Sequence, residues 1–96
     1  MRNYEGVFIV NPDLAPEASK SVVAQLQESI AKNGGRVDGL QDWGRKRMMY
    51  KIKKKQEGNY VLLNFQMDSA QAKKLELAIR LNENILRYLL INKDEQ

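Results

Sequence analysis

The sequence predicts an α+β fold with the element order β-α-β-β-α-β. Two segments with apolar residues at helical spacing each follow a segment in which apolar and polar residues alternate. The long extended stretch between them is typical of a hairpin. Right-handed β-α-β connections then place both helices on one face of a four-stranded antiparallel sheet with the strand order 2-3-1-4. This arrangement is the ferredoxin-like sandwich.

Residues 2–10 predict the first strand and the following segment the first helix. The strand ends in an apolar run before the turn-forming Asn11-Pro12-Asp13. Pro16 suits the first turn of a helix, because its missing N–H has no partner there in any case. The apolar stripe continues to about Lys32, and Asn33-Gly34-Gly35 supplies a left-handed cap.

The second strand is predicted over residues 36–53 and the third over residues 60–67, with a turn at residues 56–59 between them. A strand as long as the second rarely stays straight, so we expect Gly39 and Gly44 to mark kinks or bulges. Trp43 is expected to be at least half buried, with stacking on RNA bases as the alternative.

The last part of the sequence predicts a helix and a fourth strand. Asp68 is the expected N-cap, with Gln71 completing a variant of the capping box. The helix is expected to end near Leu81, and alternation predicts a strand over residues 85–91. Residues 92–96 form a short polar tail.

One face of this sheet has no helix over it, yet alternation makes that face apolar. Its members are Val7, Ile9, Tyr60, Leu62, Arg87, Leu89 and Ile91. A sheet face in contact with water is normally polar. An apolar patch bordered by basic residues on a chain of this size therefore predicts a docking surface.

Residues 44–55 concentrate the positive charge of the chain. They contain seven of its 16 basic residues and no acid, leaving nine basic against 12 acidic residues elsewhere. The net charge of +4 is therefore local, and such a field attracts polyanions. Met48, Tyr50 and Ile52 alternate with their neighbours, which predicts a basic strand with one apolar face. Lys53-Lys54-Lys55 also fits a merely solvated loop.

Composition argues against catalysis. The 96 residues, 43% of them hydrophobic, suit one domain spanning residues 1–96, and no cofactor or metal is expected. The absence of Cys and His removes thiolate catalysis and the commonest general base. An acylphosphatase-like enzyme that uses Arg and Asn is the enzymatic alternative, although residues 11–14 replace its glycine-rich phosphate cradle. No apolar run reaches the ~18 residues of a membrane helix, and the polar start does not fit a secretory signal, so we expect a cytoplasmic protein.

Three segments carry a resemblance to a known family. Residues 1–5 are Met-Arg-Asn-Tyr-Glu, residues 11–12 are Asn-Pro, and residues 44–53 are Gly-Arg-Lys-Arg-Met-Met-Tyr-Lys-Ile-Lys. With these segments, essentially the whole chain resembles bacterial small-subunit ribosomal protein six. Met48 and Met49 depart from that family, which usually has Leu and a small residue there.

The resemblance implies a non-enzymatic constituent of the small ribosomal subunit, located on the ribosome in the cytoplasm. It implies binding to the central domain of small-subunit (16S) ribosomal RNA together with ribosomal protein eighteen, during assembly of the platform. The RNA-binding residues are then expected to be Arg2, Asn3, Arg87, Asn92 and Lys93. Partner binding is expected at Val7, Ile9, Arg45, Lys46, Arg47, Tyr60, Leu62, Leu89 and Ile91. The alternative is a small regulatory or protein-docking domain that self-associates through its bare sheet face and ignores RNA.

Overall fold

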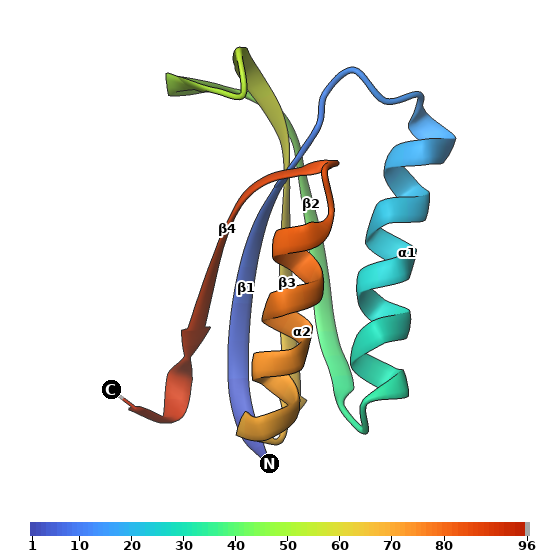
Figure 1. Cartoon of the computed structure of the whole chain (residues 1–96), viewed down its shortest axis with the longest axis vertical. Coiled ribbons are helices and arrows are strands. Elements are labelled where there is room, and N and C mark those ends of the chain that lie inside the picture. Colours follow the sequence, from blue (N-terminus) through green and yellow to red (C-terminus); the bar gives the residue numbers. More distant parts are fainter. Residues whose placement is uncertain (96) are drawn as a thin grey trace.

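The computed structural model describes residues 1–95 and confirms the predicted ferredoxin-like sandwich (Figure 1). The elements are β1 (Arg2–Val10), α1 (Pro16–Lys32), β2 (Arg36–Ile52), β3 (Lys55–Met67), α2 (Ser69–Leu81), β4 (Ile85–Asn92) and a short 3₁₀ helix, η1 (Lys93–Glu95). Antiparallel pairing gives the predicted sheet order β2-β3-β1-β4. Most of the expected polar tail is therefore ordered as η1, and Gln96 lies outside the described residues.

The core lies between the sheet and the two helices. Phe8 and Leu63 from the sheet and Ile30 from α1 are fully buried, as the alternation predicts. Tyr4 stacks on Phe65 with ring centroids 5.5 Å apart and an interplanar angle of 19°. This packing fixes which face of each strand points away from the helices.

The end of α1 follows the predicted left-handed cap. Gly34 has φ of +81°, and its N–H donates to the carbonyl of Ala31 at 3.1 Å. The N–H of Gly35 donates to Ile30 O at 2.8 Å, which completes a Schellman motif. The chain can therefore turn directly from α1 into β2.

The predicted capping box of α2 is wrong. Asp68 is the N-cap residue of α2, as predicted, with φ of −68° and ψ of 142°, but its side chain makes no capping hydrogen bond to the described residues of α2. Antiparallel pairing of Arg2 with Met67 brings the chain start beside Asp68, and the N-terminal ammonium lies 3.9 Å from its Oδ1. The Asp68 carboxylate therefore interacts with the N-terminal ammonium and not with the backbone amides of α2.

The predicted turn at residues 56–59 is also wrong, because these residues belong to β3. The turn lies at Lys53 and Lys54, and β3 begins at Lys55. Gly58 is a packing glycine: a Cβ there would lie 2.2 Å from Ile9 Cγ2. The small residue that suggested a turn in fact allows β3 to pack closely beside β1.

The predicted bulges of β2 are confirmed. The pairing with β3 shifts between Val37 and Gly39 and again between Asp42 and Gly44. Gly44 has φ of +76°, a conformation that side chains other than glycine rarely adopt. Each shift reverses which residues of β2 face the helices.

Candidate nucleic-acid and partner interfaces

Four of the five expected RNA-binding residues meet at one end of the sheet. Tyr4 pairs with Asn92, so Arg2 and Asn3 at the start of β1 lie beside Asn92 and Lys93 at the end of β4. Arg2 and Lys93 are exposed, so their charges are available to a ligand. We call Arg2, Asn3, Asn92 and Lys93 the terminal cluster.

An acid that the sequence did not suggest organises the terminal cluster. The backbone N–H of Asn3 donates to Asp94 Oδ2 at 2.8 Å, and Asn3 Nδ2 donates to Asp94 Oδ1 at 3.3 Å. These two bonds, first the backbone one, lower the pKa of Asp94 below its ordinary value, and the charge of Arg2 adds to the effect. The backbone N–H of Asp94 in turn donates to Asn92 Oδ1 at 3.0 Å. The sequence feature that could have indicated the role of Asp94 is the polar run Asn92-Lys93-Asp94, in which the side chain of the first residue can accept a hydrogen bond from the backbone N–H of the third.

Arg87 does not join the terminal cluster. It pairs with Ile9 near the far end of β1, while Asn92 pairs with Tyr4 near its start. Its exposed side chain lies on the helix-free face, toward the end of the sheet from which the β2–β3 hairpin extends. The expected set of five is thus divided between the two ends of the molecule.

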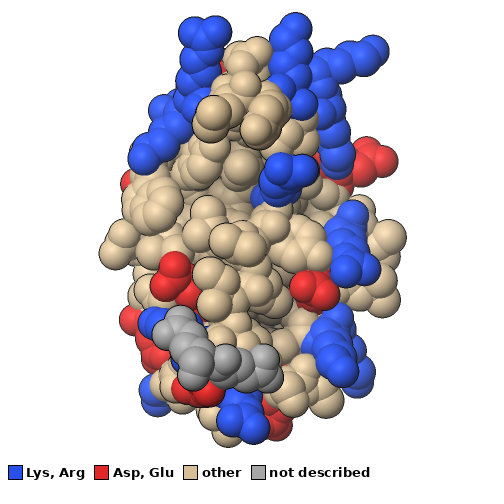
Figure 2. All heavy atoms as spheres, turned by 90° about the vertical axis from the view of Figure 1, so that its left-hand side faces the viewer, with Lys and Arg blue, Asp and Glu red and all other residues tan. Residues whose placement is uncertain are grey.

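The helix-free face carries the expected apolar side chains in adjacent rows. Val7 pairs with Leu62 on one side and Leu89 on the other, and Ile9 pairs with Tyr60. Leu89 is 57% exposed, whereas Leu62 is only 8% exposed and offers little surface to a partner. Ile91 is half buried opposite Glu5. In Figure 2 uncharged side chains fill the middle of this side of the molecule, and Lys and Arg side chains gather at its upper end.

The bulge at Trp43 places this residue on the helix-free side, where it is exposed and lies outside the buried core in which a packing role was expected. Trp43 is 43% exposed and its Nε1 donates to Gln41 Oε1 at 3.0 Å. Lys46 lies over its ring, with Nζ 5.1 Å from the centroid. This cation–π contact holds Lys46 and Trp43 together as one exposed unit.

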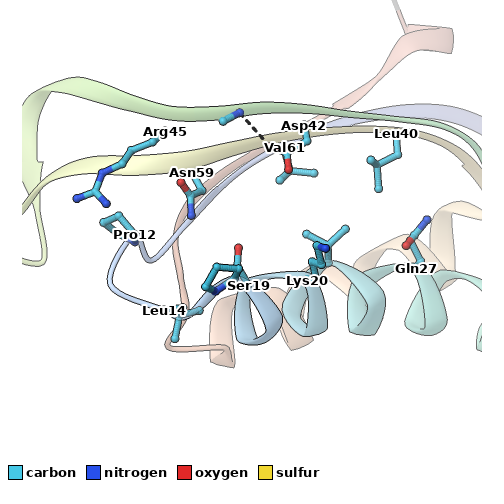
Figure 3. A pocket seen from close by; sticks show the side chains of 13 residues that line it. Pro12, Leu14, Ser19, Lys20, Gln27, Leu40, Asp42, Arg45, Asn59 and Val61 are labelled. Carbon is cyan, nitrogen blue, oxygen red and sulfur yellow. Dashed lines mark hydrogen bonds between the residues drawn. The ribbon is translucent and has the colours of Figure 1, made fainter.

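Arg45 lies on the opposite side of β2 from Lys46. It lines a groove of ≈ 670 Å³ between α1 and the sheet (Figure 3). Its guanidinium also forms an ion pair with Glu57. The floor and walls of the groove are Leu14, Val23, Leu40 and Val61, with Lys20 and Asp42 among the polar residues. In the strand register Arg47 of β2 lies opposite Glu57 of β3, and alternation along β2 places the Arg47 side chain on the same side as Arg45. The basic residues 45–47 are therefore divided between the two faces of β2, an edge strand of the sheet.

A second ion pair closes one end of this region. Lys55 at the start of β3 pairs with Asp13 in the loop between β1 and α1. The hydrogen bond and the charge of Lys55 lower the pKa of Asp13 below its ordinary value, and Arg45 contributes to the same shift. The turn end of the hairpin is thereby tied to the loop between β1 and α1.

Residues 1–95 contain no group of three or more His, Cys, Asp or Glu side chains arranged to hold a metal ion. In the same residues no helix is long and apolar enough to cross a membrane.

The fold and these surfaces define a small ferredoxin-like protein with exposed basic and apolar faces. Residues 3–92 match the family described as Ribosomal protein S6, and the chain belongs to this family. Members of this family are structural and non-enzymatic, so the expectation that the chain is not an enzyme is confirmed. The family also confirms the expected location on the bacterial ribosome in the cytoplasm.

Relatives match over nearly the full length of both chains. Two proteins named small ribosomal subunit protein bS6 are similar: the one from Thermoanaerobacter pseudethanolicus is 40% identical over 95 residues, covering 99% of this chain and 100% of its own. The one from Moorella thermoacetica is 41% identical over 96 residues, covering 100% and 98%. The crystal structure of 30S ribosomal protein S6 from Thermotoga maritima superposes with a TM-score of 0.92 at 27% identity, covering 98% of this chain and 89% of that one. The C-terminal domain of MgtC from Mycobacterium tuberculosis (TM-score 0.64, 12% identity, covering 96% and 87%) shares the fold alone.

Proposed function

We propose that this structural constituent of the small ribosomal subunit binds the central domain of 16S ribosomal RNA together with ribosomal protein eighteen. The observation that carries the proposal is the terminal cluster, where two exposed cations and two amide side chains meet beside an apolar face that no helix covers. The cluster supplies contacts to phosphates, and the apolar face supplies the surface for a protein partner.

The charge of the terminal cluster is small, which favours binding as part of a heterodimer. Arg2 and Lys93 each neutralise about one phosphate, and Asp94 offsets part of their charge. Such a site gives low affinity alone. A basic partner that docks on the adjacent face adds both charge and contact area to the same RNA surface.

The RNA contact is tested with the double variant Arg2→Ala/Lys93→Ala. In complex with ribosomal protein eighteen, its affinity for a central-domain RNA fragment should fall, and the slope of log K against log salt should become shallower by about 1.4–1.8. The matched control is Lys73→Ala/Lys74→Ala, which removes two exposed lysines from α2 and should leave both quantities unchanged. Equal effects of the two double variants contradict a specific cluster.

Partner docking is tested on two leucines of equal exposure. Leu89 on the helix-free face is 57% exposed, and Leu77 on α2 is 58% exposed. Leu89→Ala should weaken the heterodimer by more than about 1 kcal/mol, as a residue at the centre of an interface does, while Leu77→Ala should have no effect. The opposite ranking would move the docking surface to α2.

Arg45 and Arg47 join this interface if the partner reaches over β2. This strand is the edge of the sheet, with Lys46 and Trp43 on one side and Arg45 in the groove on the other. A partner segment that crosses the edge contacts both sides. In this account Arg45→Ala and Lys46→Ala weaken the heterodimer separately, and their effects add because the two side chains do not touch.

Self-association through the same face is the second candidate function, favoured by the 57% exposure of Leu89. Sedimentation of the protein alone separates the two candidates. A monomer at micromolar concentration that forms a one-to-one complex with ribosomal protein eighteen supports the heterodimer. A stable homodimer that excludes this partner supports self-association.

A further inference from the structure

The tip of the β2–β3 hairpin is an irregular segment that presents side chains to solvent. From Arg47 to Ile52 β2 advances five residues, while β3 advances two from Lys55 to Glu57, so β2 contains three more residues than its partner. Met49 is 89% exposed and Tyr50 is 71% exposed. We call residues 48–55 the hairpin tip.

The bulge in the hairpin tip is anchored at its base. Met48 is only 6% exposed, and Gln56 Nε2 donates a hydrogen bond of 3.0 Å to the Met48 carbonyl. Lys55, at the other end of the tip, is held by Asp13. Tyr50 is therefore projected from a fixed base, which is what an aromatic side chain needs in order to act as a stacking platform.

In the described part of the chain, three of the four lysines of the hairpin tip keep an unpaired charge, Lys55 being the exception. Among residues 1–95, Lys51, Lys53 and Lys54 form no ion pair, and residues 44–56 contain no acid. Lys53 and Lys54 hold φ values of 50° and 67° at the two central positions of the turn, where Asn-Gly is the usual choice. Unfavourable backbone conformations of this kind collect at functional sites.

The hairpin tip and the terminal cluster lie at opposite ends of the molecule. The chain measures 36 Å along its longest axis, with the hairpin at the upper end of Figure 1 and the N-terminus at the lower end. The tip also bends toward the helix-free side, where Arg87 and Lys46 face the same direction. A ligand at the tip is thus separate from one at the terminal cluster.

We propose that the hairpin tip is a second RNA-binding site, which takes an unpaired or bulged nucleotide. Tyr50 stacks on the base while Lys51, Lys53 and Lys54 bind the flanking phosphates. This inference rests on the proposed function and extends it: the protein holds two separated segments of the same RNA. RNA is favoured over an acidic protein because an exposed tyrosine among unpaired lysines, without an acid or an apolar pocket, fits a base and its phosphates.

The test uses the heterodimer with ribosomal protein eighteen and the same central-domain fragment. Tyr50→Ala should weaken RNA binding by about 5- to 100-fold, as the loss of one base–aromatic stack does. Lys53→Asn/Lys54→Gly should make the salt slope shallower by about 1.4–1.8, although this change gives the turn its preferred residues. Lys73→Ala/Lys74→Ala, with the same loss of charge on α2, should bind as the unmodified protein does. Thermal unfolding of each variant shows that it is folded.

Three outcomes separate the two claims. If the unmodified heterodimer does not bind the fragment, the proposed function itself fails. If it binds and both tip variants bind equally well with unchanged salt slopes, the tip is not an RNA site although the function stands. If the tip variants weaken the heterodimer in the absence of RNA, the tip contacts protein and the inference is overturned. A photo-crosslinking residue at position 50 should attach to RNA and not to the partner.

Discussion

The backbone N–H of Asn3 donates a 2.8 Å hydrogen bond to the carboxylate of Asp94, joining the first strand to the last turn of the chain. The bond links residues 91 positions apart and fixes the geometry of the terminal cluster. It also keeps Asp94 ionised, since the pKa of this carboxyl is lowered first by that bond. Stability and the shape of the expected RNA site therefore depend on the same carboxylate.

The Asp94 carboxylate should stabilise the protein in a pH-dependent way. Its folded pKa is below the unfolded value of about 4, so the contribution is complete above pH 4 and disappears as the pH falls through the folded pKa. Asp94→Asn should therefore lower the urea midpoint at pH 7 and make little difference at pH 2. Glu83→Gln, at an exposed acid without a hydrogen bond or ion pair in the described structure, is the control. A deficit of Asp94→Asn that persists unchanged at pH 2 contradicts this account.

Gly44 should be required for its backbone conformation and not for space. A Cβ at Gly44 or at Gly39 would meet no atom within 4 Å, but only Gly44 has a positive φ, +76°. Gly44→Ala should thus cost about 1–2 kcal/mol of unfolding free energy, and Gly39→Ala should change it by less than about 0.5 kcal/mol or stabilise slightly. Denaturant unfolding of the two variants measures the difference. Equal costs would show that the bulge at Trp43 does not need its left-handed residue.

The lysines of the β2–β3 turn should make the hairpin less stable than it can be. Both have positive φ, so Lys53→Asn/Lys54→Gly should raise the unfolding free energy by about 1–2 kcal/mol. Lys53→Ala/Lys54→Ala removes the same charge without improving the turn and serves as the control. If the alanine variant gains as much stability, the cause is charge repulsion and not backbone conformation.

Gly58 should be intolerant of a side chain because of Ile9. A Cβ at position 58 would lie 2.2 Å from Ile9 Cγ2, and a β-branched side chain on a strand has little freedom to move aside. Gly58→Ala should cost about 1–3 kcal/mol. The Ile9→Ala substitution removes the clashing atom, so the double variant should be more stable than the sum of the single effects predicts. Strict additivity would mean that another contact limits position 58.

The fold could be predicted from the sequence because hydrophobic periodicity decides element type and topology rules decide strand order. Predictions for single residues were wrong where the same residue type suits two different structural roles. Gly58 resembled a turn residue but allows close strand packing. Asp68 is the N-cap residue, as predicted, but its carboxylate lies near the N-terminal charge and makes no capping hydrogen bond to the described residues of α2. The real turn uses Lys53 and Lys54, residue types that turn preferences do not favour, so no sequence signal marked it.

For the candidate site, the sequence predicts which residues are available but not how they are arranged in space. Pairing in an antiparallel sheet brings Arg2 close to Lys93, as expected, but the same register carries Arg87 to the far end. The bulges in β2 set the phase of its alternation, so that Arg45 lines the groove while Lys46 and the exposed Trp43 lie on the helix-free side. Side-chain direction after a bulge depends on one extra residue, and sequence alternation does not say where that residue lies.

Cooperative binding to RNA is the decisive measurement for the proposed joint action with ribosomal protein eighteen. A 16S central-domain fragment is titrated with this protein alone, with ribosomal protein eighteen alone, and with both, at two salt concentrations. We expect weak binding by this protein alone and tight, strongly salt-dependent binding by the pair, with an affinity greater than the two separate affinities combined. The opposite result is binding by the pair that is no tighter than the separate affinities predict and no tighter than binding to random duplex RNA. That result would rule out joint binding to the central domain.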